Sequence, residues 1–457
     1  MAVARTLELA TAALDFEIPL ESNDPRFVDF AAVRGGGSVE RLKKLLQRQS
    51  PDQWLHAVFA SHRGAGKSTE IKRLAHDLGD KYYSIYFEAT VELDATSFEM
   101  EDLLLVIARV VEERMRIRGT PLPKAELAKV ERFFADVVFS DEYGQSYLAD
   151  IRTEAKAESG IPFFAKLTAA LTASMKRTSD HKETIKRQVK RFPGALMTHV
   201  NNLLSAANEQ LVKDGRRLLL LIDNMDRYKP QVIDELLIAS QDVFKSLQCH
   251  LIVTPPIDLV LTPETQSIEN VFHCETMPTV KLREKNQGYW EFSGEGRSKL
   301  LEALRKRIDL EKLIPDATAR DRLVSASGGG IRELLEMTQS ATLDATGAVI
   351  TADDVELTLN RHRSWLRNRM DANGWWEALA EIAATKRLSD DPKQLDVVFQ
   401  RLAFQYNGDV WYDVHPLVSD LLTSHTSETK QKGTSRAAAK KKTAVKKNSA
   451  IKKKGLS

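Results

Sequence analysis

Short apolar runs alternate with longer amphipathic segments over the first 280 positions. The strand-like runs lie at 54–60, 82–88, 218–223 and 250–254. Segments between them, such as 67–78 and 98–116, repeat apolar residues at helical spacing. The run LLLLI at 218–222 is apolar without alternation, which is typical of a strand buried on both faces. Strands that alternate with helices predict an α/β fold with a parallel sheet.

Helical patterns dominate after residue 295. The helices expected there lie at 297–307, 317–326, 331–345, 375–386 and 392–403. The pair Asn407-Gly408, between FQY and VWYDV, predicts a β-hairpin. Residues 120–215 are mostly helical in pattern and highly charged, with a break at 159–162, and predict a helical insertion between two strands. The apolar stretch 161–175 within it suits either a partner surface or ordinary packing against the core.

These patterns predict five parts of the chain. They are an N-terminal segment at 1–50, a core at 51–290 with an insertion at about 120–215, a helical section at 291–348, a last folded section at 350–425 and a disordered basic tail at 426–457. A chain of 457 residues is long enough for more than one core.

Composition narrows the class of protein. Only Cys249 and Cys274 occur, without metal-type spacing or a disulfide framework. No apolar stretch approaches the ~18–20 residues that cross a bilayer, so no membrane partner is expected. The N-terminus carries acids where a signal peptide would be apolar. A cytoplasmic location is therefore expected.

The formal net charge of +2 conceals an asymmetry. Eleven of the 66 basic residues lie within 430–457, which holds no acid, so 55 basic residues face all 64 acids in the rest. The lysine clusters at 438–454 predict salt-sensitive, sequence-independent binding to DNA or RNA. A solvated, disordered tail is the alternative. Without aromatic residues, any binding by the tail itself should be electrostatic.

A candidate phosphate-binding loop follows the first strand. Its residues are Ser61, His62, Arg63, Gly64, Ala65, Gly66, Lys67 and Ser68, with Thr69 next in the helix. This is the G-x-x-x-x-G-K-[ST] pattern with Ser61 in place of the first glycine. Small residues let backbone N–H groups surround a phosphate, and the following helix points its positive end at the anion. Lys67 adds a charge for the β- and γ-phosphates, and Ser68 a hydroxyl for Mg²⁺.

The apolar strand 218–223 ends in a carboxylate. Asp223 is expected at the carboxyl edge of the sheet, beside the loop, where it can hold Mg²⁺ through water. Hydrolysis also needs an acid that orients the attacking water. Asn224 is a neutral amide and a poor base, so Asp226 and Glu88, at the end of the second strand, are the two candidates.

Four segments together resemble the AAA+ superfamily of P-loop ATPases, near its replication-initiator and STAND signalling branches. They are SHRGAGKST, LLLLIDNMD, HLIVT and SGGGIRELLEM. The resemblance covers roughly residues 27–118 and 215–348 and implies ATP and Mg²⁺ as ligands. It implies that Thr254 senses the γ-phosphate, that Arg332 contacts it from the lid and that Arg34 borders the adenine. Two alternatives stay open. In one, Arg332 serves only to cap or solubilise a lid helix, and in the other, Thr254 simply ends a strand.

The resemblance also implies a parallel-sheet P-loop NTPase core with a helical lid at 291–348. The section from about 371 to 422 looks like a C-terminal winged-helix-like domain, a module that binds DNA or packs against the ATPase core. No arginine finger is identified, although Arg227 and Arg307 are candidates. Ser61 and Asn224 depart from the family pattern.

Three functions fit these features. The first is an ATP-hydrolysing switch or remodeller that acts on a protein partner, on another copy of the chain or on nucleic acid. The second is a non-hydrolysing, nucleotide-dependent scaffold or a STAND-like signalling regulator, such as one that acts in defence. Asn224 favours the absence of hydrolysis. The third is a P-loop kinase, against which stand the long C-terminal extension and the D-x-x-D turn.

Overall fold

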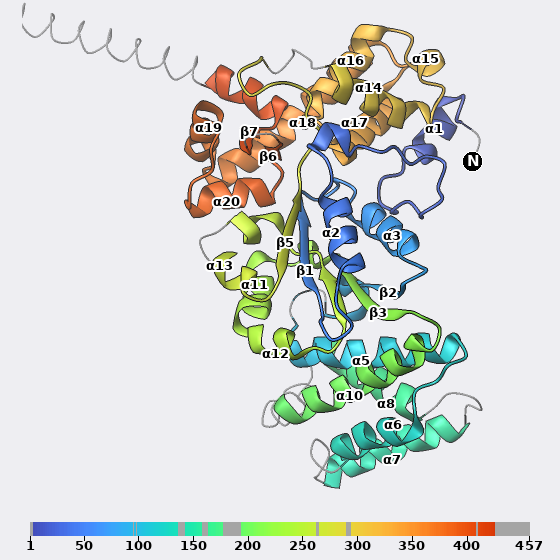
Figure 1. Ribbon diagram of the computed structural model, residues 1–457. Helices are drawn as coiled ribbons and strands as arrows, with labels where there is room; N and C mark the ends of the chain where they lie inside the picture. Colours follow the sequence, from blue (N-terminus) through green and yellow to red (C-terminus); the bar gives the residue numbers. More distant parts are fainter. Residues whose placement is uncertain are drawn as a thin grey trace, which may run out of the picture. The chain divides into compact units, whose positions relative to one another are not determined.

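The computed structural model divides the chain into two units (Figure 1). One unit is Phe16–Thr279, and the other joins Met1–Asp15 to Val280–Ser457. The described residues are 3–94, 96, 98–135, 142–157, 163–176, 193–261, 265–288, 294–407 and 410–425. The predicted tail at 426–457, the break at 159–162 and the turn residue Gly408 lie outside them. The predicted 1–50 segment is divided between the two units.

The first unit contains a five-stranded parallel sheet in the order β2-β3-β4-β1-β5. Its strands are β1 (His56–Ser61), β2 (Tyr82–Glu88), β3 (Arg217–Asp223), β4 (His250–Val253) and β5 (His273–Met277). Because all pairs are parallel, the carboxyl ends of the strands share one edge. β4 lies between β1 and β3, so the loop after β1 and the acid that ends β3 stand on either side of β4.

Apolar side chains on alternating positions bury both faces of the central strands. Leu219 and Leu221 of β3 pack in one cluster with Phe59 of β1, while Leu218 and Leu220 point to the other face and are also fully buried. The sequence analysis did not predict β5. That strand carries polar His273 and Glu275 and lies at the sheet edge, where it pairs only with β1.

Helices surround this sheet. They are α2 (Ser38–Gln47), α3 (Lys67–Asp77), α4 (Ala89–Glu92), α11 (Pro230–Ala239), α12 (Gln241–Ser246) and α13 (Thr265–Glu269). Leu42 and Leu46 of α2 and Ile71 and Leu74 of α3 pack onto one face of the sheet. The single helix predicted at 231–247 is two helices, which separate at Ser240.

The described part of the insertion is mostly helical, as predicted. The helix before the insertion is α5 (Met100–Ile117). The insertion contains α6 (Lys124–Phe133), α7 (Glu142–Ala157), α8 (Phe163–Lys176) and α10 (Pro193–Val212). They lie side by side in Figure 1, and α8 and α10 both contact α5. Phe164, Leu167 and Leu171 of α8 are fully buried, so ordinary packing accounts for these apolar residues.

The second unit is mostly helical. Its helices are α1 (Leu7–Ala13), α14 (Gly294–Arg305), α15 (Leu310–Leu313), α16 (Ala317–Ala326), α17 (Ile331–Asp344), α18 (Ala352–Asn373), α19 (Trp376–Thr385) and α20 (Pro392–Phe399). The strands β6 (Ala403–Tyr406) and β7 (Trp411–Val414) pair antiparallel, as the hairpin signal predicted. The winged-helix assignment stays a prediction. None of the described helices combines the length and apolar character that crossing a membrane requires.

The N-terminal residues belong to this helical unit. Ala4 forms a parallel bridge with Ile308. The hydroxyl groups of Thr11, in α1, and Thr342, in α17, are 2.8 Å apart. α1 and the residues before it are therefore held by backbone and side-chain contacts to residues more than 300 positions later in the chain.

Gly296 in α14 stands where a larger residue does not fit. A methyl group at this position would overlap the backbone carbonyl of Lys281. We expect Gly296→Ala to lower the free energy of unfolding by about 1–3 kcal/mol, the usual cost of overpacking. Gly294, two residues earlier in the same helix, has open space around it, so Gly294→Ala is the matched control. Urea unfolding followed by tryptophan fluorescence measures both, and equal stability of the two variants would contradict the packing argument.

Candidate functional site

The loop between β1 and α3 is shaped by two glycines. Gly64 and Gly66 have φ angles of 78° and 96°, a left-handed region that favours glycine. α3 then begins at Lys67. The first N–H groups of a helix have no partner within it, and the helix dipole makes this end positive. The local geometry is therefore suited to an anion.

Lys67 lies at the centre of the loop with its side chain only 5% exposed. Its Nζ donates to the carbonyl oxygens of Ser61 at 2.9 Å and His62 at 3.3 Å. The same Nζ lies 2.7 Å from Oδ2 of Asp226, whose side chain is 9% exposed. The ammonium group is thus paired with an acid within a mostly buried pocket of the loop.

Asp226 belongs to the turn Met225–Arg227, which follows β3. The Nε of Arg63 donates to the backbone carbonyl of Asp226 at 2.7 Å. Together with the Lys67 ion pair, this contact joins the loop after β1 to the turn after β3. The two chain segments therefore meet at the carboxyl edge of the sheet although β4 separates their strands.

The carboxylate of Asp223 is buried and held by three donors. Oδ1 accepts hydrogen bonds from Thr254 Oγ1 and from the backbone N–H of Asn224, both at 2.8 Å. Oδ2 accepts one from Tyr86 Oη, also at 2.8 Å. Burial and the charge of Asp223 raise the pKa of Tyr86, so its hydroxyl remains a donor. A carboxylate offers about four acceptor sites, so one site at Oδ2 remains.

Glu88 lies beside Asp223 in the register of β2 and β3. Its Oε2 accepts a hydrogen bond of 2.6 Å from Asn224 Nδ2, and its Oε1 lies 3.4 Å from Tyr86 Oη. Asn224 adopts a φ of 62°, which asparagine tolerates better than most residues. Asn224 and Tyr86 therefore link the two carboxylates of Asp223 and Glu88.

Tyr86 and the structural role of Asn224 were missed by the sequence analysis. Tyr86 is two residues before Glu88 in the same predicted strand, so both side chains lie on one face of the sheet. That spacing was the available signal. Asn224 was considered only as a missing acid, because a sequence does not show that its amide contacts a carboxylate on the neighbouring strand.

The side chain of Arg34 contacts the backbone of the loop. Its Nη2 donates to the carbonyl oxygen of Ala65 at 2.6 Å, and its Nη1 lies 3.1 Å from the sulfur of Met277. Burial lowers the pKa of Arg34 to about 10, and the nearby charge of Glu70 partly opposes that shift. Arg34 thus contacts the loop, and its expected place at an adenine stays a prediction.

The remaining predicted residues divide between the two units. Ser68 is half-buried in the first turn of α3, and the Thr69 hydroxyl beside it accepts a hydrogen bond of 3.1 Å from the backbone of Leu20. Arg332, by contrast, is the second residue of α17 in the helical unit, so its predicted contact with a phosphate stays a prediction. Among the described residues, no three His, Cys, Asp or Glu side chains gather into a metal-binding cluster.

Comparison with known proteins gives one family match. Residues 62–273 match the model of the KAP family P-loop domain. The matched range begins in the loop after β1 and reaches β5, so it includes Lys67, Asp223 and Asp226. This part of the chain is a P-loop NTPase domain similar to that family, which confirms the predicted fold. Such domains bind nucleotide. No curated protein sequence matches the chain.

Several solved structures are similar over most of the chain. A Walker-type ATPase of Pyrococcus abyssi is 11% identical with a TM-score of 0.43, and the match covers 90% of this chain and 99% of that one. Cdc6p from Pyrobaculum aerophilum is 10% identical with a TM-score of 0.35, covering 86% and 93%. The Orc1 protein of Aeropyrum pernix, in complex with DNA, is 11% identical with a TM-score of 0.38, covering 85% and 91%.

Proposed function

We propose that the chain is an ATP-hydrolysing switch of the AAA+ type that acts on a partner protein, on another copy of itself or on nucleic acid. The observation that carries this proposal is the ion pair between Lys67 and Asp226 at the N-terminus of α3. A buried ammonium group at a helix N-terminus, directly after two left-handed glycines, is a site for an anion. Asp226 occupies that position with its own carboxylate.

ATP binding then exchanges one anion for another. The β- and γ-phosphate oxygens replace the Asp226 carboxylate at Lys67, and the backbone N–H groups of residues 63–68 surround the phosphates. The remaining acceptor site on Asp223 and the hydroxyl of Ser68 would hold Mg²⁺, which neutralises charge on the phosphates. The three hydrogen bonds that orient Asp223 support this assignment.

Thr254 and Glu88 connect the nucleotide to the rest of the unit in this proposal. Thr254 donates to Asp223 and follows β4, the strand between the two halves of the site. Glu88 orients the attacking water, and Asn224 holds its carboxylate. A change in the contacts of Thr254 and Glu88 on hydrolysis is the signal that the partner receives.

We expect Lys67→Ala to weaken ATP binding by about 10–100-fold, because a hydrogen bond to a charged group contributes roughly 1.5–3 kcal/mol. Isothermal titration calorimetry with ATP and Mg²⁺ measures the loss. Lys43→Ala is the matched control, since Lys43 pairs with Asp77 on the far side of α3 at 2.9 Å and does not line the loop. Binding by Lys67→Ala as tight as that of the wild type would contradict the proposed site.

The double variant Lys67→Ala/Asp226→Ala separates binding from folding. Lys67→Ala alone leaves Asp226 buried without its cation, which destabilises a protein. The double variant removes that unpaired charge, so we expect its thermal stability to recover while ATP binding stays weak. Tight ATP binding by the double variant would mean that the unpaired carboxylate of Asp226, rather than the loss of the Lys67 ammonium group, weakens binding in Lys67→Ala.

A non-hydrolysing, nucleotide-dependent scaffold is the second candidate. Asn224 favours it, because an amide stands where a second acid would assist hydrolysis. A wild type that binds ATP but turns it over no faster than Lys67→Ala would select the scaffold.

A further inference from the structure

The second half of α18 is a basic surface that none of the proposed nucleotide contacts uses. Four arginines lie between positions 361 and 369, and no acid occurs between Glu356 and Asp371. In their midst Trp365 is 55% exposed. A tryptophan this open leaves part of its ring accessible to a ligand, and tryptophan is enriched at interfaces because its large apolar ring carries a polar N–H.

Only part of the positive charge on this helix is neutralised. Arg361 pairs with Asp344, and Arg363 lies 3.0 Å from Asp420. Arg367 is exposed and forms no ion pair with any described residue. Arg369 instead lies over the ring of Trp365, 4.5 Å from its centroid. Burial and the nearby charge of Arg401 lower the pKa of Arg369. The two guanidinium groups therefore lie close to each other.

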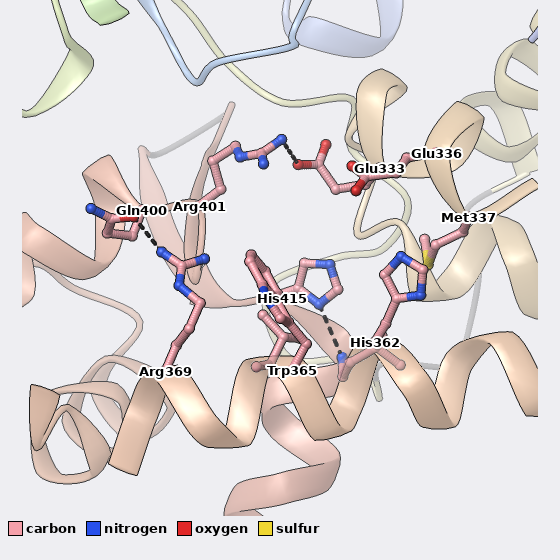
Figure 2. A pocket seen from close by; sticks show the side chains of 11 residues that line it. Glu333, Glu336, Met337, His362, Trp365, Arg369, Gln400, Arg401 and His415 are labelled. Atoms are coloured by element: carbon pink, nitrogen blue, oxygen red, sulfur yellow. Dashed lines mark hydrogen bonds and ion pairs between the residues drawn. The ribbon is translucent and has the colours of Figure 1, made fainter. Parts of the chain in front are cut away.

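A pocket opens beside Trp365 (Figure 2). We call it the α18 pocket, and it is formed by His362, Trp365 and Arg369 of α18 with Met337, Arg401 and Leu417. Met337 and Leu417 give it apolar walls. His362 Nδ1 contacts the carbonyl oxygen of Thr358 at 3.0 Å, which leaves its Nε2 available to a ligand.

Two acids, Glu333 and Glu336, and two arginines, Arg369 and Arg401, are the charged side chains among those that line the α18 pocket. Arg401 donates to Glu333 at 2.7 Å, so that acid is already paired. The other lining acid, Glu336, can accept hydrogen bonds from amino groups of a ligand. Burial and neighbouring charges lower the pKa of His415 to about 3, so its ring stays neutral. Arg369, which also donates to Gln400, then remains in the pocket to meet negative charge.

We propose that the α18 pocket binds single-stranded nucleic acid. One base stacks on Trp365, and the adjoining phosphates contact Arg361 and Arg369, which lie one helical turn before and after it on the same face of α18. Stacking needs a base whose face is free, which a strand offers and a duplex hides. Arg361, with its side chain 66% exposed, lies about 12 Å along the helix from Arg369. Cations spread over that length match a strand better than a single nucleotide. This inference does not rest on ATP binding or hydrolysis.

The test compares two ligands on the full chain without ATP. Fluorescence anisotropy is recorded with a labelled 20-nucleotide oligothymidine and with a duplex of the same length. The wild type should prefer the single strand. Trp365→Ala should weaken single-strand binding by about 5–150-fold, from the loss of a stacked base, and leave duplex binding unchanged. Trp365→Phe should retain most of the affinity because it keeps an aromatic face.

Charge is tested by the salt dependence of single-strand binding. Arg361→Ala should reduce the slope of log affinity against log salt by about 0.7, the value for one phosphate contact. Arg305→Ala, on α14 in the same unit, is the control and should leave the slope unchanged. Calorimetry with ATP on Trp365→Ala shows whether the P-loop site is intact, so failure here is distinct from failure of the proposed ATPase.

Three outcomes would overturn the proposal. The first is a wild type without preference for the single strand. The second is an unchanged preference in Trp365→Ala. The third is thymidine monophosphate binding as tightly as the 20-nucleotide strand, which would make the pocket a small-molecule site.

Discussion

Replacing Glu88 by Gln should lower the rate of ATP turnover by about 10²–10⁴-fold, the usual contribution of a positioned acid or base. Asp223 is occupied by three donors and Asp226 is paired with Lys67. Glu88 is the acid at this edge whose carboxylate is held by a neutral amide. Glutamine has the same shape but accepts no proton, so affinity for ATP should stay within a few-fold of wild type. Steady-state turnover and calorimetry measure the two effects separately.

The matched comparison for Glu88→Gln is Asp226→Asn. That variant removes the carboxylate that competes for Lys67, so ATP should bind more tightly than to the wild type. If Asp226→Asn abolishes turnover while Glu88→Gln leaves it unchanged, Asp226 is the water-orienting acid and the assignment to Glu88 is wrong.

Asp413→Ala should lower the free energy of unfolding of the helical unit by about 3–5 kcal/mol, the cost of breaking a buried ion pair. Asp413 in β7 is completely buried. Its Oδ2 accepts hydrogen bonds from Arg283 and, at 2.7 Å, from Lys386, while Oδ1 accepts one from the backbone of Val414. Burial already lowers the pKa of Lys386. Without Asp413, two cations would face each other with little access to water.

Urea unfolding followed by tryptophan fluorescence measures this loss, because five of the six tryptophans lie beyond residue 280. Asp321→Ala is the control. Asp321 pairs with Arg297, but both side chains are 33% exposed, and surface pairs of this kind contribute at most about 1 kcal/mol. Equal losses in Asp413→Ala and Asp321→Ala would show that burial of Asp413 adds nothing.

The apolar pattern was sufficient to predict the central strands, because a strand that is buried on both faces is a continuous run of apolar residues in the sequence. Tyr82–Glu88 was predicted with its observed bounds. β5 was missed because polar residues are tolerated on an edge strand that has one neighbour. The division of 231–247 at Ser240 was missed because both helices have compatible apolar spacing. Packing, rather than local pattern, decides such boundaries.

The candidate site shows the same limit. Motif spacing placed Lys67 and Asp223 at one edge of the sheet, since parallel strands end together. It did not predict that Lys67 pairs with Asp226 or that Asn224 holds Glu88, because these contacts depend on the strand order and on side-chain directions. The α18 pocket was also missed, since Met337, Trp365 and Arg401 come from separate segments of the chain.

The attachment of the N-terminus to the helical unit has a consequence for synthesis on the ribosome. Ala4 pairs with Ile308, and α1 packs on α17. At about 5–20 residues per second, these partners emerge roughly 15–60 s after α1 does. The whole sheet unit is made in that interval. α1 is thus translated before the sheet unit and reaches its final neighbours only after that unit has been made, and during this interval its apolar side is open to chaperones.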